Sequence, residues 1–166
     1  ARVPDFRLLY RLAELLELDV SGWLLGTPPY LTSGDIQRLL ADGFSIGAHS
    51  VDHSLFCGIS PEQAIRQTVE SVDQLVTQFD LAYRVFAFPY GEFQLSRDLL
   101  RTLQSAANVQ MMFGTRGVIY DELEPWLVQR MLAEEPTGDL RHCLKQQLNL
   151  QLQRRWCGRN LVKRTG

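Results

Sequence analysis

Cysteine is scarce in this sequence, whose 166 residues hold only Cys57, Cys143 and Cys157. Their odd number and irregular spacing argue against a disulfide framework and against a cysteine metal site, so we expect reduced thiols. No apolar run approaches the 18 residues or more that a membrane span needs, so we expect no membrane span. The first residues also lack the pattern of a signal peptide. The segment is typical of the cytoplasm, and the cell envelope is the alternative if a signal was removed.

An excess of charge of one sign is lacking too. The chain has 17 Lys and Arg residues against 19 Asp and Glu residues, a net charge of −2. We therefore expect no nucleic-acid partner. The exception is the segment 151–166, a basic C-terminal helix or tail that we expect to be solvated, with binding of an anion or a partner as the alternative. Its cations are Arg154, Arg155, Arg159, Lys163 and Arg164.

What is present is an alternation of helical and strand-like segments in a chain whose length suits one domain, residues 1–166. Apolar periodicity and capping residues predict helices over 6–18 (capped by Asp5), 33–42, 60–79, 96–107 and from Thr137 or Asp139 to Trp156. Short apolar runs predict strands over 20–25, 44–48, 85–88, 109–113 and 126–131. This order predicts an α/β fold of βα units, with a parallel sheet or barrel.

Two of the three histidines, His49 and His53, follow the predicted strand 44–48. On one helical turn such a pair shares a face, with β-carbons about 5–6 Å apart. Two neutral imidazoles can then bind one metal ion at about 2.0–2.1 Å each. The alternative is a pair of loop or cap histidines. Because Thr27-Pro28 and Pro89-Tyr90 also follow predicted strands, at the end where parallel α/β folds carry their sites, the metal site is favoured.

Two segments resemble motifs of the NodB-type polysaccharide deacetylases. Residues 44–56, Phe-Ser-Ile-Gly-Ala-His-Ser-Val-Asp-His-Ser-Leu-Phe, are similar to the family's metal-binding Gly-x-His-Ser/Thr-x-x-His segment. Residues 86–91, Phe-Ala-Phe-Pro-Tyr-Gly, resemble its Pro-Tyr motif, and Leu127-Val-Gln-Arg130 resembles a later strand that ends in arginine. The resemblance covers roughly residues 6–135. It implies a distorted or incomplete (β/α) barrel.

The resemblance also implies an activity, the hydrolytic removal of acetyl groups from an acetylated oligosaccharide, polysaccharide or glycoconjugate. His49 and His53 would hold a divalent metal together with a carboxylate, with zinc expected and cobalt, nickel or manganese as alternatives. A second carboxylate would act as the base. Pro89 and Tyr90 would contact the substrate. Because Pro89 has no N–H, the backbone of Tyr90 is the expected oxyanion donor; the alternative is an ordinary turn with a half-buried tyrosine.

The chain departs from the family at two motifs. The Thr-Phe-Asp-Asp-Gly segment that supplies the base and the carboxylate ligand is absent, so we expect the chain to begin after the first strand or to lack the pair. Asp5 is the nearest acid, and we expect it to be a helix cap rather than a displaced ligand. Leu140-Arg141-His142 matches the letters of the general-acid segment but follows a helix start, which favours a surface histidine. Two other readings stay open: an inactive carbohydrate-binding or scaffold domain, and a metal-dependent amidohydrolase of small C–N substrates.

Overall fold

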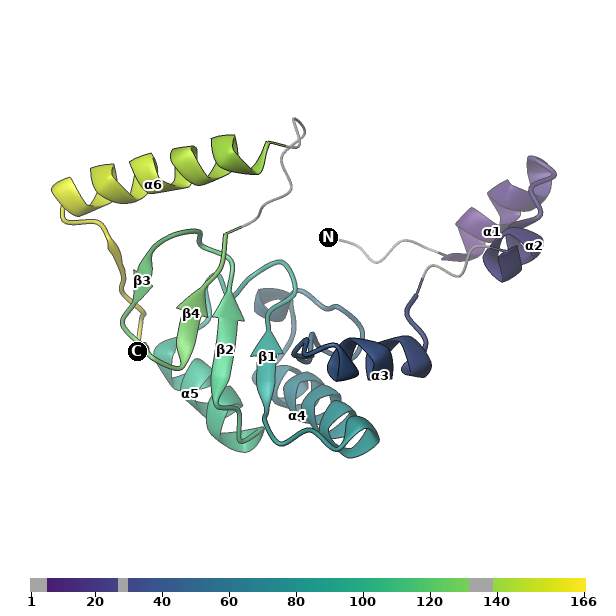
Figure 1. Ribbon diagram of the computed structural model, residues 1–166, viewed down its shortest axis with the longest axis horizontal. Coiled ribbons are helices and arrows are strands. Elements are labelled where there is room, and N and C mark those ends of the chain that lie inside the picture. The colour runs from purple at the N-terminus through teal and green to yellow at the C-terminus, as the bar shows by residue number, and fades with distance from the viewer. Residues whose placement is uncertain (1–5, 27–29, 132–138) are drawn as a thin grey trace. The chain divides into compact units, whose positions relative to one another are not determined.

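The computed structural model describes residues 6–26, 30–131 and 139–166. The chain forms two compact units, residues 1–46 and 47–166. The first unit contains the helices α1 (Phe6–Leu15), α2 (Val20–Gly26) and α3 (Ser33–Ala41) (Figure 1). The helix expected from Ser33 is confirmed, but its cap is Thr32, whose hydroxyl accepts the N–H of Asp35 at 3.2 Å. The expected cap Asp5, and Thr27-Pro28, lie outside the described residues.

The strand predicted over 20–25 is wrong, because the structure has helix α2 there. Asp19 begins this helix: its carboxylate accepts the N–H of Gly22 at 2.8 Å, and its carbonyl accepts the N–H of Trp23 at 3.0 Å. A side-chain acceptor at this position is a helix N-cap. The apolar run was too short to separate helix from strand by periodicity, and the capping residue decides the outcome.

The second unit is built on a parallel sheet of three strands, β1 (Val85–Ala87), β2 (Met111–Gly114) and β4 (Leu127–Gln129), in the order β1-β2-β4. Two short strands, β3 (Tyr120–Asp121) and β5 (Leu161–Val162), pair separately, also in parallel. The carboxyl ends of β1, β2 and β4 point to the same edge (Figure 1). The α/β fold with parallel strands is confirmed, and a barrel stays a prediction.

The strand predicted over 44–48 is reduced to one bridge, in which Ala48 pairs in parallel with Phe86. The N–H of Ala48 donates to Val85 O at 3.0 Å, and the N–H of Ala87 donates to Ala48 O at 2.8 Å. Gly47 permits this approach, since a Cβ there would lie 2.7 Å from Cγ2 of Val85. The segment therefore delivers His49 to the carboxyl end of β1, as expected, without a full strand.

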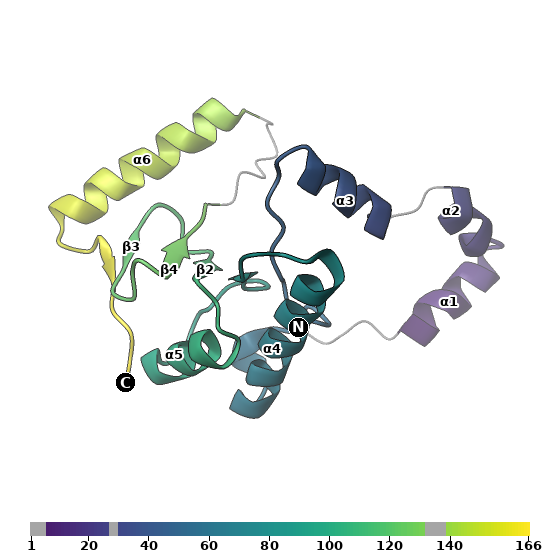
Figure 2. The ribbon, with the colours of Figure 1, turned by 60° about the horizontal axis from the view of Figure 1, so that its bottom comes forward.

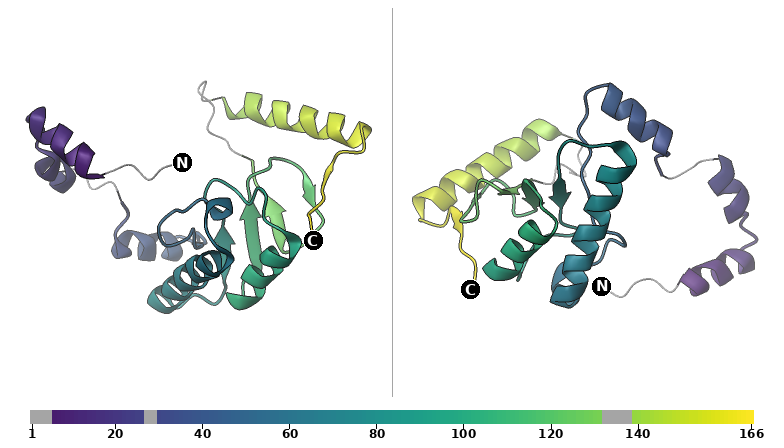
Figure 3. Two further views of the ribbon diagram at one scale, coloured as in Figure 1. Left: turned by 180° about the vertical axis from the view of Figure 1, so that it is seen from behind. Right: turned by 90° about the horizontal axis from the view of Figure 1, so that it is seen from below.

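Helices α4 (Pro61–Phe79) and α5 (Arg97–Ala106) cover one face of the sheet (Figure 3). Ser60 caps α4 in a capping box with Gln63, and Ser96 caps α5, as the sequence predicts. Between Ala48 and α4 lies a short 3₁₀ turn, η1 (Phe56–Gly58). The largest side chains that are fully buried beneath these elements are apolar: Phe56, Phe86, Phe88, Leu100, Leu103, Met112 and Leu127.

The chain ends with α6 (Leu140–Trp156), which is capped by Asp139 and lies beyond the carboxyl ends of β2 and β4 (Figure 1; a second view is given in Figure 2). The alternative start, Thr137, lies outside the described residues. The expectation of a solvated tail is wrong for Arg164, whose residue surface is only 7% exposed, because β5 anchors the segment to β3. Within the described ranges, no helix is both long and apolar enough to cross a membrane.

Candidate functional site

His49 and His53 are brought together by a loop rather than by a helical turn. Their ring centroids lie 4.8 Å apart, with an angle of 69° between the ring planes. The loop reverses through left-handed backbone at Ser50 (φ 69°) and His53 (φ 58°). The Ser50 hydroxyl oxygen accepts the N–H of His53 at 2.9 Å, which stabilises the reversal. His49 and His53 therefore lie close together, as the sequence predicts, but they do so on a loop and not on the helical turn from which their proximity was expected.

The loop is fixed from beneath by α4 and by an aromatic cluster. The buried Gln67 of α4 accepts the backbone N–H of Val51 at 2.8 Å and that of Asp52 at 3.3 Å through Oε1. Further along, Phe56 packs against Phe86 and Phe88 with ring centroids 5.7 Å and 5.3 Å away. These separations are typical of favourable aromatic pairs. The histidine loop is thus attached to β1, the strand that leads to the Pro-Tyr turn.

The hydrogen bonding of His49 leaves one ring nitrogen free to bind a metal. Nδ1 lies 2.8 Å from the carbonyl oxygen of Ala87, which can only accept, so Nδ1 carries the hydrogen and Nε2 keeps its lone pair. Burial lowers the pKa of His49, an effect that the bond to Ala87 opposes and the charges of His53 and Arg130 reinforce. A neutral imidazole with its other N–H held by a carbonyl is the usual metal-binding form.

The turn Pro89-Tyr90-Gly91 directly follows β1 and adjoins the histidines. The rings of Tyr90 and His53 meet edge to face, with centroids 4.8 Å apart. Tyr90 has φ 56° and Gly91 has φ 134°. The Tyr90 N–H donates to no acceptor among the described residues, while the Tyr90 carbonyl accepts the hydroxyl of Thr115 at 3.1 Å. The turn therefore presents a free backbone donor and a 60% exposed tyrosine beside the two imidazoles.

Arg130 follows β4 and adds a cation to the same edge of the sheet. Its Nη2 donates to the carbonyl of Phe88 at 3.0 Å, and its positive charge contributes to the lowered pKa of His49. Its Nε is buried and has no hydrogen-bond partner among the described residues. A buried donor without an acceptor is costly, so the position suits an acceptor oxygen. The sequence predicts a strand that ends in Arg130, but it does not predict the contact of Arg130 with the Phe88 carbonyl.

His142 does not join the cluster. It is exposed on α6, where Nε2 lies 2.6 Å from Nε2 of Gln146, and no contact links it to His49, His53 or Tyr90 among the described residues. Asp52 is also engaged elsewhere: its carboxylate accepts the hydroxyl of Ser54 at 2.6 Å, which lowers the pKa of Asp52. No group of three or more His, Cys, Asp and Glu side chains able to hold a metal occurs in residues 6–26, 30–131 and 139–166.

Sequence reasoning missed Glu92, the residue after the Pro-Tyr-Gly turn, which is fully buried. Its Oε1 accepts hydrogen bonds from Arg116 Nε at 2.9 Å, Gln129 Nε2 at 3.1 Å and Arg164 Nη2 at 2.9 Å. Burial alone would raise the pKa of Glu92, but a hydrogen bond from the backbone, together with the hydrogen bonds and charge of Arg164 and the bond from Arg116, outweighs it, and the pKa lies below its ordinary value. The only sequence signal was an acid directly after a predicted functional turn.

The chain is similar in sequence and in fold to known deacetylases. A family model described as polysaccharide deacetylase matches residues 20–112, which include His49, His53 and the Pro-Tyr turn. None of the curated proteins compared with the chain matches it. The solved structure of the Streptococcus pyogenes deacetylase PplD in complex with acetate is similar in fold, with a TM-score of 0.59 at 19% sequence identity. The match covers 74% of this chain and 53% of the streptococcal chain, so this chain spans about half of that protein's length. Because the family model matches more than half of the 166 residues, the chain belongs to the polysaccharide deacetylase family.

Proposed function

We propose that the chain acts as a metal-dependent hydrolase that removes acetyl groups from an acetylated sugar polymer or glycoconjugate. The observation that carries the proposal is the convergence of His49, His53 and the Tyr90 turn at the carboxyl end of β1. The membership of the family supports the chemistry. The streptococcal relative, whose printed description is a deacetylase in complex with acetate, is consistent with it.

The two imidazoles suit a divalent metal, because His49 is neutral at physiological pH and its Nε2 is free. They would supply two ligands, and a third would have to come from outside the described residues or from solvent. Nitrogen ligands favour zinc, with cobalt, nickel and manganese as alternatives. The chemistry that a bound divalent ion supplies is polarisation of the acyl oxygen and activation of water.

The residues of the turn would act on the acetyl group itself. Among the described residues the N–H of Tyr90 has no acceptor, and the turn is held by the bond from Thr115 to the Tyr90 carbonyl, so this N–H would donate to the oxyanion. One such donor is worth about 2.7–4 kcal/mol in comparable enzymes. Pro89 and the exposed Tyr90 ring would contact the sugar. Burial, reinforced by the charges of His53 and Arg130, lowers the pKa of His49 and would keep it neutral, and therefore able to bind metal, at lower pH.

A second candidate is a carbohydrate-binding domain without catalysis. The observation in its favour is that the described residues contain two histidines at the site but no group of three metal ligands. In this case the turn and the histidines would contact sugar, and acetate would not be released. The two candidate functions differ in one measurable product, the acetate that only the hydrolase would release.

The test measures acetate released from chitotetraose by the chain after chelation and readdition of zinc or cobalt. We expect release that depends on the metal and disappears in His53→Ala. Binding of chitotetraose without acetate release, in protein that has taken up metal, would establish the second candidate. Failure to take up metal and failure to bind the oligosaccharide would exclude both.

A further inference from the structure

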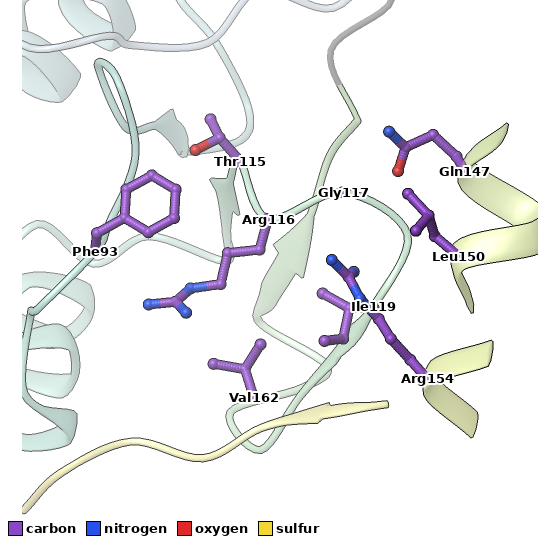
Figure 4. A pocket seen from close by; sticks show the side chains of 9 residues that line it. All are labelled: Phe93, Thr115, Arg116, Gly117, Ile119, Gln147, Leu150, Arg154 and Val162. Carbon is purple, nitrogen blue, oxygen red and sulfur yellow. The ribbon is translucent and has the colours of Figure 1, made fainter. Parts of the chain in front are cut away.

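A cavity lies between α6 and the loop 115–119 (Figure 4). Its volume is about 440 Å³, within the range of sites for small molecules. Its wall includes Phe93 and Thr115, and the hydroxyl of Thr115 donates to the carbonyl of Tyr90. Thr115 therefore both lines the cavity and holds the turn of the candidate site.

The charge of the cavity is positive. Its lining includes Arg116 and Arg154 and no acidic side chain. Arg116 is already paired, because its Nε donates to the buried Glu92 at 2.9 Å, so the charge available to a ligand is that of Arg154. Arg154 makes no ion pair within the part of the chain that the structure describes, and α6 carries four Lys and Arg residues and no acid. A guanidinium group without a balancing acid favours an anionic ligand.

The shape and apolar surface of the cavity favour a ring rather than a bare anion. The Phe93 ring is 42% exposed at its wall, with the guanidinium carbon of Arg116 4.9 Å from the ring centroid. Figure 4 shows Arg116 extending toward Phe93, while Arg154 reaches from α6 toward the loop that carries Ile119. Gln147 adds an amide that can bond to hydroxyl groups. An apolar face, an amide and the cation of Arg154 together match an acidic sugar.

We propose that this cavity binds an acidic sugar unit of the substrate polymer, with Arg154 binding its carboxylate or phosphate and the exposed part of Phe93 packing against its ring. The identity of the ligand as a neighbouring unit of the polymer rests on the proposed function, because Thr115 joins the cavity to the turn that would bind the acetylated unit. The cavity thereby selects anionic over neutral polymers. Arg154 is the residue that determines this preference.

The test is calorimetric titration of the metal-free chain with three probes: a hyaluronan tetrasaccharide, N-acetylglucosamine 6-phosphate and neutral chitotetraose. The first carries carboxylates and the second a phosphate, so the comparison identifies the source of the negative charge. We expect at least one anionic probe to bind about tenfold more tightly than chitotetraose, the gain of one good hydrogen bond to a charged group. Equal affinity for all three probes, or no binding of either anionic probe, overturns the proposal.

Two variants on the same helix separate the cavity from general electrostatic attraction. Arg154→Gln removes the cation that lines the cavity, whereas Arg155→Gln removes the exposed neighbouring cation, which does not line it. We expect Arg154→Gln to weaken binding of the anionic probe about tenfold and to leave chitotetraose binding unchanged. Arg155→Gln should change either affinity less than twofold. An equal loss in both variants overturns the assignment of the cavity.

The proposal about the cavity and the proposed function fail in different ways. Binding is measured without metal, so the absence of acetate release from any substrate rejects the hydrolase and leaves the result of the titration intact. Conversely, release of acetate from chitotetraose with no selectivity for the anionic probes rejects the subsite and leaves the hydrolase intact.

Discussion

Arg164 Nη2 lies 2.9 Å from Glu92 Oε1 and thereby joins the C-terminal segment to the residue that follows the Pro-Tyr-Gly turn. Both side chains are buried, with exposed fractions of 2% and 0%. The same guanidinium also contacts Asp121, at 2.5 Å. The buried network thus contains two carboxylates and two guanidinium groups, which neutralise each other beneath the turn: those of Glu92, Asp121, Arg164 and Arg116. The conformation of the turn consequently depends on residues far along the chain.

Replacing Arg164 with methionine should destabilise the protein markedly. Arg164→Met keeps much of the apolar side-chain volume but leaves Glu92 and Asp121 buried with fewer donors, and breaking such a buried pair typically costs about 3–5 kcal/mol. Urea denaturation would measure the loss. The control is Lys163→Met, one residue earlier and exposed, which should change the free energy of unfolding by less than about 0.5 kcal/mol. Equal effects of the two substitutions would show that the buried ion pairs are unimportant.

The stability contributed by Glu92 should depend on pH. Its pKa in the folded protein lies below the ordinary value of 4.5, so the folded state favours the charged form. The contribution is therefore fully present above pH 4.5 and is lost as the pH falls below 4.5 toward the folded-state pKa. We expect the difference in unfolding free energy between the wild type and Glu92→Gln to be constant from pH 7 to 5 and to narrow below about pH 4.5. A difference that stays constant down to pH 3.5 would contradict this.

The parts of the fold that the sequence predicted are those with local causes. Ser60, Ser96 and Asp139 each cap the helix that they were expected to begin, because a cap bonds to backbone only two or three residues away. The residues 44–47 illustrate the opposite case. They have the apolar composition of a strand, but a strand also needs a neighbouring strand along its length, and the β-bridge that the structure describes for this segment is the one between Ala48 and Phe86.

The residues of the candidate site also fall into two groups, those that the sequence predicts and those that it does not. His49, His53 and Tyr90 could be predicted because each follows directly on a strand-like run and carries distinctive chemistry. The bond between Glu92 and Arg164 spans 72 residues, and no periodicity or spacing connects the two. The sequence consequently predicts a solvated tail that includes Arg164, whereas the structure buries this side chain. Long-range pairing of ordinary charged residues is the information that one sequence alone does not carry.

Substituting Gly91 with alanine should disturb the turn that presents the Tyr90 N–H. Gly91 has φ 134°, and an added Cβ would overlap the Thr115 hydroxyl and the Phe93 ring. We expect a loss of about 1–3 kcal/mol of stability from backbone strain and overpacking, and reduced acetate release. Thermal unfolding and the acetate assay would measure the two effects. Gly58→Ala is the control, because a Cβ there meets no atom within 4 Å. Unchanged activity in Gly91→Ala would exclude Tyr90 N–H as a positioned donor.

Removing either imidazole of the pair should abolish retention of zinc while the fold persists. His49→Ala loses the bond to Ala87 and His53→Ala an exposed ring, so each should cost only about 0.5–1.5 kcal/mol of stability. Metal content after dialysis, measured by inductively coupled plasma mass spectrometry, should fall to background in both variants. His142→Ala, on the surface of α6, should retain metal as the wild type does. Unchanged metal content with a large drop in melting temperature would instead assign His49 and His53 a structural role, because the rings would then be holding the loop against β1 and the Pro-Tyr turn.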